Sequence, residues 1–180
     1  MANQRAAQRQ LYEACAPYVF TIVKNYIRDE HFRKDAMQEA FAHIFTSLKN
    51  YDANKGNFKN WIARITVNRC AVLLKRTINF NLRPEEEGGD IASENVFAYL
   101  DQLTKRDIEQ MLQKMPAGYR TIFLMSVMDG YSHKEIGMML NIAPETSRSQ
   151  LLRATKWIKK NILPDSKEFF LNKDLTYGIR

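Results

Sequence analysis

Residues 131–155, with the sequence YSHKEIGMMLNIAPETSRSQLLRAT, have the pattern of two helices joined by a tight turn. Ser132 can cap the first helix, and Glu135, three residues later, can complete a capping box. Asn141 tolerates the left-handed backbone of a helix end, and Pro144 suits the first position of the next helix. We therefore expect a helix-turn-helix, which is how a compact α domain presents a helix to the DNA major groove.

The second helix of this pair separates inward from outward residues. Leu151, Ala154 and Ile158 fall on one face and can pack inward. The residues left for the groove or its walls are Thr146, Arg148, Ser149, Leu152, Arg153 and Lys156. Arginine can form paired hydrogen bonds with guanine edges there. An ordinary helical hairpin would show the same spacing, so this segment alone does not establish DNA binding.

The rest of the chain also keeps the apolar spacing of helices, and no stretch alternates as a strand should. Helical patterns cover residues 4–28, 33–49, 58–75, 93–114 and 117–128. The segment NFNLRPEEEGGDIASEN has no apolar period and reads as a linker. We predict an all-α protein with two small helical domains, residues 1–80 and 104–163, joined by a flexible linker, 81–103. The tail, 164–180, remains unassigned.

The charges are divided unevenly along the chain, whose formal net charge is +7. Residues 53–84 contain seven lysines or arginines and no acid, whereas residues 85–101 contain six acids and no base. A basic helix followed by an acidic tether suggests a nucleic-acid surface beside a segment that is kept off it or imitates nucleic acid. A solvated face beside a solvated linker is the alternative.

The second predicted helix has an apolar stripe and a polar strip. We expect the stripe to be core; it consists of Ala36, Met37, Ala40, Phe41, Ile44, Phe45 and Leu48. The strip beside it is neutral to acidic and contains Asp35, Gln38 and Glu39. It could dock a basic protein partner, or it could be plain solvent surface. In the third helix, Trp61 stands among cations, a combination that can clamp unpaired bases or simply belong to the core.

No catalytic or metal-binding constellation is apparent. His31, His43 and His133 share no metal-ligand spacing with acids or cysteines, and no glycine-rich phosphate loop occurs. We expect His133 to be exposed to solvent. Cys15 and Cys70 suggest buried thiols in a reducing cytoplasm. No run approaches the roughly 18 apolar residues of a membrane span. We expect the protein to have no enzymatic activity, to hold no cofactor or metal, and not to insert into a membrane.

In order and spacing, these elements resemble the extracytoplasmic-function (ECF) group of bacterial sigma factors, which are initiation subunits of RNA polymerase. The resemblance covers about residues 11–162. The signature of an acid followed by xxQExF stands here as Asp35, Gln38, Glu39 and Phe41. The stretch WIARITVNRC resembles the family's tryptophan-led pattern, and residues 112–154 are similar to its C-terminal pattern of LP, then GxS, EIA and SRLxRA.

The resemblance implies a sigma region 2 domain, an acidic linker through the polymerase cleft, and a sigma region 4 domain. The strip of Asp35, Gln38 and Glu39 would bind the clamp helices of core polymerase. Minus-ten DNA would be opened and held by Lys55, Lys59, Trp61, Arg64, Asn68 and Arg69. Minus-thirty-five DNA would be read by Thr146, Arg148, Ser149, Leu152 and Arg153, with Gln150 and Lys156 nearer to phosphate. A further implied partner is an anti-sigma factor.

Four positions depart from the family pattern. Val72 stands where an aspartate is expected, and Lys75 replaces an arginine. Ser147 replaces a valine on the inward face of the recognition helix. Ala143 replaces a small polar cap, which forgoes about 1 kcal/mol of capping.

The expected function is promoter-specific transcription initiation with core polymerase. The alternative is a stand-alone helix-turn-helix regulator that binds duplex DNA without polymerase. A third class is a protein-interaction module whose basic surface serves an acidic partner.

Overall fold

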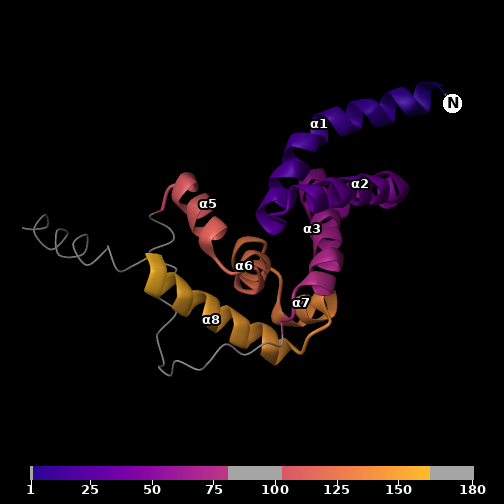
Figure 1. Cartoon of the computed structure of the whole chain (residues 1–180). Helices are drawn as coiled ribbons and strands as arrows, with labels where there is room; N and C mark the ends of the chain where they lie inside the picture. Colours follow the sequence, from indigo (N-terminus) through magenta and orange to yellow (C-terminus); the bar gives the residue numbers. More distant parts are fainter. Residues whose placement is uncertain (1, 81–102, 163–180) are drawn as a thin grey trace, which may run out of the picture. The chain divides into compact units, whose positions relative to one another are not determined.

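The computed structural model describes residues 2–80 and 103–162, and within these ranges it contains helices and no strand. The all-α prediction is therefore confirmed. The predicted linker and tail fall almost entirely outside the described residues, as does the start of the pattern at 93–114. The helices in chain order are α1 (Ala2–Tyr26), α2 (Glu30–Ser47), α3 (Phe58–Thr77), α5 (Lys105–Lys114), α6 (Ala117–Phe123), α7 (His133–Leu140) and α8 (Pro144–Ile162) (Figure 1).

The described residues form two compact units. One is built on α1, α2 and α3, and the other on α5, α6 and α8 with most of α7. Each unit has its own buried apolar side chains, so each is described by itself.

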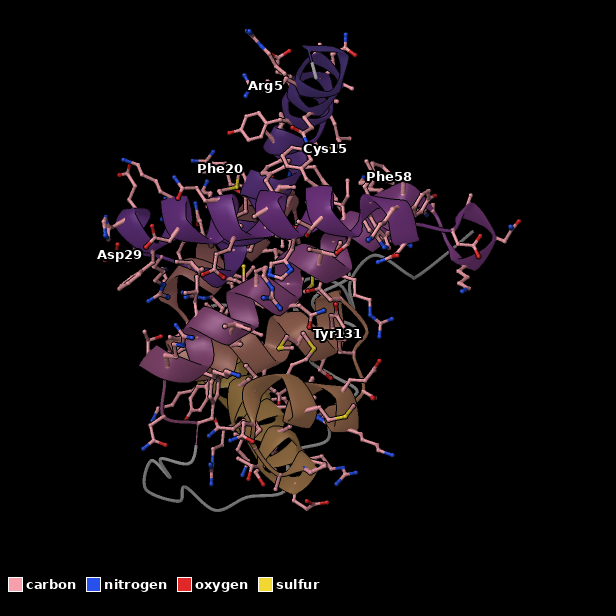
Figure 2. The ribbon with its side chains drawn as sticks, turned by 90° about the vertical axis from the view of Figure 1, so that its right-hand side faces the viewer. Arg5, Cys15, Phe20, Asp29, Phe58 and Tyr131 are labelled. Carbon is pink, nitrogen blue, oxygen red and sulfur yellow. The ribbon has the colours of Figure 1, made fainter. Side chains whose placement is uncertain are left out.

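In the first unit, α1, α2 and α3 all pack against one another. The N-terminal part of α1 extends beyond α2 and α3, and Arg5 lies on this extension (Figure 1 and Figure 2). All residues from Arg5 to Gln10 are exposed. The core side chains are fully or almost fully buried and include Val19, Val23, Tyr26, Ala36, Ala40, Ile44, Ile62, Val67, Cys70 and Ala71.

Two helices of the first unit, α2 and α3, begin at polar caps. The Asp29 carboxylate accepts hydrogen bonds from the backbone N–H groups of His31 and Phe32 and starts α2. The Asn57 side chain accepts from the Asn60 N–H at 2.8 Å and starts α3. Figure 2 shows Asp29 and Phe58 at the beginnings of these two helices. Such caps satisfy N–H groups that have no partner inside the helix.

The apolar stripe of α2 is confirmed in part. Ala36, Ala40, Phe41 and Ile44 are buried, and Met37 and Phe45 are half-buried. The prediction that Leu48 is core is wrong, because α2 ends at Ser47 and Leu48 begins a short 3-10 turn, η1 (Leu48–Asn50). The change of helical pitch leaves Leu48 40% exposed.

In the second unit, α6 packs against α8. Thr104 and Asp107 form a capping box at the start of α5. The pattern predicted as one helix over 117–128 begins as α6 and continues as a π-helical segment, η3 (Leu124–Met128). Ile122, Phe123, Met125 and Ile158 are among the fully buried side chains of this unit.

Candidate nucleic-acid interface

The helix-turn-helix formed by α7 and α8 has the predicted local chemistry, both at the start of α7 and in the turn before α8. The Ser132 N–H donates to Glu135 Oε2 at 3.0 Å, and the Glu135 N–H donates to Ser132 Oγ at 3.3 Å. Asn141 adopts a left-handed φ of 57°. The Ile142 N–H donates to the Gly137 carbonyl at 3.0 Å, as in a Schellman motif. The capping box, the left-handed Asn141 and the start of α8 at Pro144 are therefore confirmed.

Gly137 permits a close approach within this turn. A Cβ atom built on Gly137 would lie 2.7 Å from the carbonyl oxygen of Ile142 and 3.5 Å from the Pro144 nitrogen. These neighbours are backbone atoms, which can move only if the turn itself changes. The absence of a side chain at residue 137 therefore sets how closely the turn folds back on α7.

The outward face of α8 carries polar and charged residues at helical spacing. Arg148, Ser149 and Leu152 are exposed and follow one another on the same face. Arg148 Nη1 donates to Glu145 Oε1 at 3.0 Å, and Ser149 Oγ donates to the Glu145 carbonyl at 2.9 Å. A backbone hydrogen bond is the largest cause that lowers the pKa of Glu145. The hydrogen bond from the Arg148 side chain and the charge of Arg148 lower it further. The Arg148 guanidinium is thus tethered while it remains mostly exposed.

The other predicted contacts of α8 are less accessible. Thr146, Arg153 and Lys156 are half-buried along its sides. Gln150 is only 3% exposed, and its side-chain amide donates to the Phe80 carbonyl, within the same unit, at 2.6 Å. In this arrangement Gln150 does not face solvent.

His133 is half-buried, so the expectation of an exposed ring is wrong. Its Nδ1 lies 2.9 Å from Ser147 Oγ, and Ser147 is completely buried. This hydrogen bond joins α7 to α8 and satisfies the hydroxyl that stands where the family pattern has valine. Burial of the ring lowers the pKa of His133 below its ordinary value of 6.5, and the charge of Arg148 lowers it further.

Acidification should weaken the helix-turn-helix through His133. Because the folded-state pKa lies below that of the unfolded chain, the unfolded chain takes up the proton first. The stability contributed by the neutral ring is complete above about pH 6.5 and declines as the pH falls below it. Hydrogen-exchange protection factors of α7 and α8 should be lower at about pH 5.5 than at about pH 7.5. In the variant His133→Gln, protection should depend less on pH, whereas His31→Gln should keep the pH dependence of the wild type. A pH dependence of protection that is unchanged in His133→Gln would contradict the prediction.

In the first unit, the predicted acidic strip lies on one exposed face of α2. Asp35, Gln38 and Glu39 are all exposed, while their neighbours in the sequence, Ala36 and Ala40, point into the core. No carboxylate of the strip has an ion-pair partner within the described residues. The strip is therefore open to a partner.

Three of the predicted minus-ten residues share a face of α3. Trp61, Arg64 and Asn68 follow helical spacing, with Arg64 exposed and the other two half-buried. The Trp61 ring stacks on Phe58 with centroids 5.6 Å apart and contacts Tyr51 at 5.5 Å. These contacts fix the tryptophan at the start of α3.

The remaining residues predicted to contact minus-ten DNA point elsewhere. Lys55, in the short turn η2 (Ala53–Lys55), lies 3.8 Å from Asp52. The Lys59 ammonium lies 4.8 Å from the centroid of Tyr18 on α1. Arg69, at the side of α3 toward α2, donates to His43. Only three of the six residues therefore share one face of α3, whereas Lys55 lies in η2, Lys59 contacts α1 and Arg69 contacts α2. The contact between Arg69 and His43 could not be predicted from the sequence, because the two residues are 26 positions apart.

The part of the chain that the structure describes contains neither a metal site nor a membrane-spanning helix. No cluster of three or more histidine, cysteine or acidic side chains could hold a metal ion there. None of the described helices has the length and apolarity to cross a membrane.

Two family models match the chain. The sigma-70 region 2 model matches residues 11–77, and the sigma-70 region 4 model matches residues 105–158. Together they span more than half of the 180 residues. The protein therefore belongs to the sigma-70 family.

Two relatives indicate to which group of the sigma-70 family the chain belongs. The ECF RNA polymerase sigma factor SigE of Mycolicibacterium smegmatis is 26% identical over 165 residues, which are 88% of this chain and 63% of that protein. The ECF RNA polymerase sigma factor SigW of Bacillus subtilis is 24% identical over 155 residues, 80% of this chain and 82% of that one. Within the family, the chain is a sigma factor of the ECF type. A stand-alone regulator is not favoured by these matches.

A solved structure is also similar. It is the sigma factor RpoE in complex with the anti-sigma factor NepR from Bartonella quintana, with a TM-score of 0.49 and 15% sequence identity over 87% of this chain and 97% of that one. The chain spans less than two thirds of the length of the mycobacterial SigE.

Proposed function

We propose that the protein joins core RNA polymerase, directs it to specific promoters and supports their opening, without performing chemistry itself. The observation that carries the proposal is the pairing of an exposed acidic strip on α2 with an exposed recognition face on α8 in a member of the sigma-70 family. The acidic strip on α2 is complementary in charge to a basic protein surface, and the exposed face of α8 can bind duplex DNA. Binding energy from both would support local strand separation.

The first domain, 1–80, would provide the polymerase and minus-ten contacts. Asp35, Gln38 and Glu39 would face the polymerase. Trp61, Arg64 and Asn68 would meet the opened strand from the exposed face of α3, where an aromatic ring can stack on an unpaired base. Lys55, Lys59 and Arg69 would contact the strand from outside that face.

The second domain, 104–163, would read the minus-thirty-five element. Arg148, Ser149 and Leu152 are the exposed residues of α8 and would enter the groove, with Thr146, Arg153 and Lys156 at its walls. We leave Gln150 out of this set because it is buried. The segment 81–103 would link the two domains through the polymerase cleft. An anti-sigma factor is the proposed regulator, and the cytoplasm is the proposed location.

A pull-down with core polymerase tests the proposal. The full chain should bind core polymerase and should lose that binding when the acidic strip is reversed in charge. Failure of the wild-type chain to bind core polymerase would overturn the proposed function.

The variant Arg148→Ala should relax sequence preference at one base pair of the minus-thirty-five element. Loss of a paired contact with guanine costs about 1–3 kcal/mol on the preferred sequence. Binding of the holoenzyme to promoters with single substitutions measures the effect. Lys105→Ala, which removes an exposed charge from α5, is the control. Equal weakening of Arg148→Ala on every sequence would show that Arg148 contacts only phosphate.

A further inference from the structure

We propose that Arg69 holds one backbone phosphate of the opened promoter strand and that His43 is the positioning residue for its guanidinium. This inference rests on the proposed function and extends it by a residue of α2 and by the chemical group that is bound. It assigns a role in DNA binding to a helix whose other proposed contacts are with polymerase.

The two side chains meet across two helices. Arg69 Nη1 lies 2.9 Å from His43 Nε2, although the residues are 26 positions apart. His43 is exposed on α2 and Arg69 is half-buried on α3. Because α2 and α3 pack directly against each other, the contact joins two elements of a single unit and does not depend on a mobile loop.

The chemistry of this contact leaves the arginine able to bind an anion. A guanidinium is always a donor, so the histidine nitrogen must accept the hydrogen bond with its lone pair. The neutral ring orients the guanidinium without neutralising its charge. One of five N–H donors is used, and the others remain for a phosphate, which guanidinium groups bind in a paired geometry.

The surroundings favour a phosphate over a carboxylate of the protein. No acidic residue occurs in residues 53–84, and no described carboxylate lies within ion-pair distance of Arg69. Glu39 is one helical turn from His43 on α2, and Arg76 is two turns from Arg69 on α3. Arg69 also follows Asn68 directly, so it stands beside the face proposed to receive the unpaired bases.

The test uses holoenzyme reconstituted from the full chain and core polymerase, on a promoter identified by run-off transcription. Each phosphate of the opened strand is replaced in turn by an uncharged methylphosphonate. In the wild type, one replacement near the minus-ten element should weaken binding about tenfold, as expected for a charge-assisted contact. Arg69→Ala should be about tenfold weaker on unmodified DNA and should lose its sensitivity at that same phosphate only.

The positioning role of His43 is tested with two substitutions. His43→Ala should weaken binding about threefold and reduce the sensitivity at the same phosphate. His43→Gln keeps an acceptor and should restore both. His31→Ala, which removes an exposed histidine from the same helix, should behave as wild type. Binding of every variant to core polymerase, measured separately, shows that the fold is intact.

The possible outcomes distinguish a failure of the proposed phosphate site from a failure of the proposed function. If the wild-type chain binds polymerase and opens the promoter, but Arg69→Ala stays sensitive at every phosphate, the site is overturned and the function stands. If His43→Ala has the same affinity as wild type and the same sensitivity to replacement of the phosphate that Arg69 contacts, His43 has no positioning role. If the wild-type chain never joins polymerase, both proposals are overturned.

Discussion

Replacing Gly137 by valine should destabilise the helix-turn-helix by about 3 kcal/mol or more, the range of a clash with a packed backbone. A Cβ at this position would already lie 2.7 Å from the Ile142 carbonyl oxygen, and valine adds two methyl groups. The turn would have to open, which would break the hydrogen bond from Ile142 N–H to the Gly137 carbonyl. Hydrogen exchange of α7 and α8 measures the local loss of stability.

The matched control for this substitution is the next residue in α7. Met138 is 70% exposed, so Met138→Val changes only helix propensity and should cost about 0.5 kcal/mol. Gly137→Ala should fall between the two, since it adds only the Cβ. Equal protection in Gly137→Val and Met138→Val would contradict the close approach of the turn. Minus-thirty-five recognition should be lost together with the local fold in Gly137→Val.

Reversing one charge of the acidic strip should reduce the affinity for core polymerase about a hundredfold, since like charges brought together at an interface cost several kcal/mol. The variant is Glu39→Lys, at an exposed position of α2 whose neighbour Ala40 is core. The change leaves the buried side of the helix untouched, so the fold should be kept. Binding of the labelled chain to core polymerase measures the affinity.

The control for charge is Glu109→Lys, at an exposed position of α5 in the other unit. It changes the net charge by the same amount and should leave polymerase affinity within about twofold, because Glu109 is not part of the strip proposed to bind polymerase and an exposed charge is screened by salt. Higher salt should weaken the wild-type complex and narrow the difference between wild type and Glu39→Lys. Equal losses in the two variants would mean that the strip is ordinary solvent surface.

Local chemistry made much of the helix-turn-helix predictable. Ser132 with Glu135, the left-handed Asn141 and the start of α8 at Pro144 depend on residues within a few positions of one another, and all three predictions are confirmed. The Arg148 and Ser149 positions on the outward face of α8 followed from helical spacing alone.

Contacts between helices were not predictable in the same way. The sequence shows a histidine near the start of α7 and a serine in α8, but only the packing of the two helices brings His133 to the buried Ser147. The burial of Gln150 depends on Phe80, which is 70 positions away. In the first unit, the contact of His43 with Arg69 likewise depends on the packing of α2 against α3.

Helix ends were predictable only where the cap was recognised. The apolar pattern placed the start of α2 at residue 33, whereas the Asp29 cap starts it at Glu30. At the other end, the predicted helix continued to residue 49, although α2 ends two residues earlier, at Ser47. The π-helical segment Leu124–Met128 keeps enough helical character to read as a plain helix in the sequence.

Run-off transcription with core polymerase and the purified chain on genomic fragments tests the central claim most directly. If the protein is a promoter-specific initiation subunit, adding it to core polymerase should produce transcripts with defined starts on a subset of fragments. Glu39→Lys should abolish these transcripts and Glu109→Lys should preserve them. A folded chain that gives no transcript above core polymerase alone on any fragment, while protecting a palindromic duplex site without polymerase, would contradict the claim.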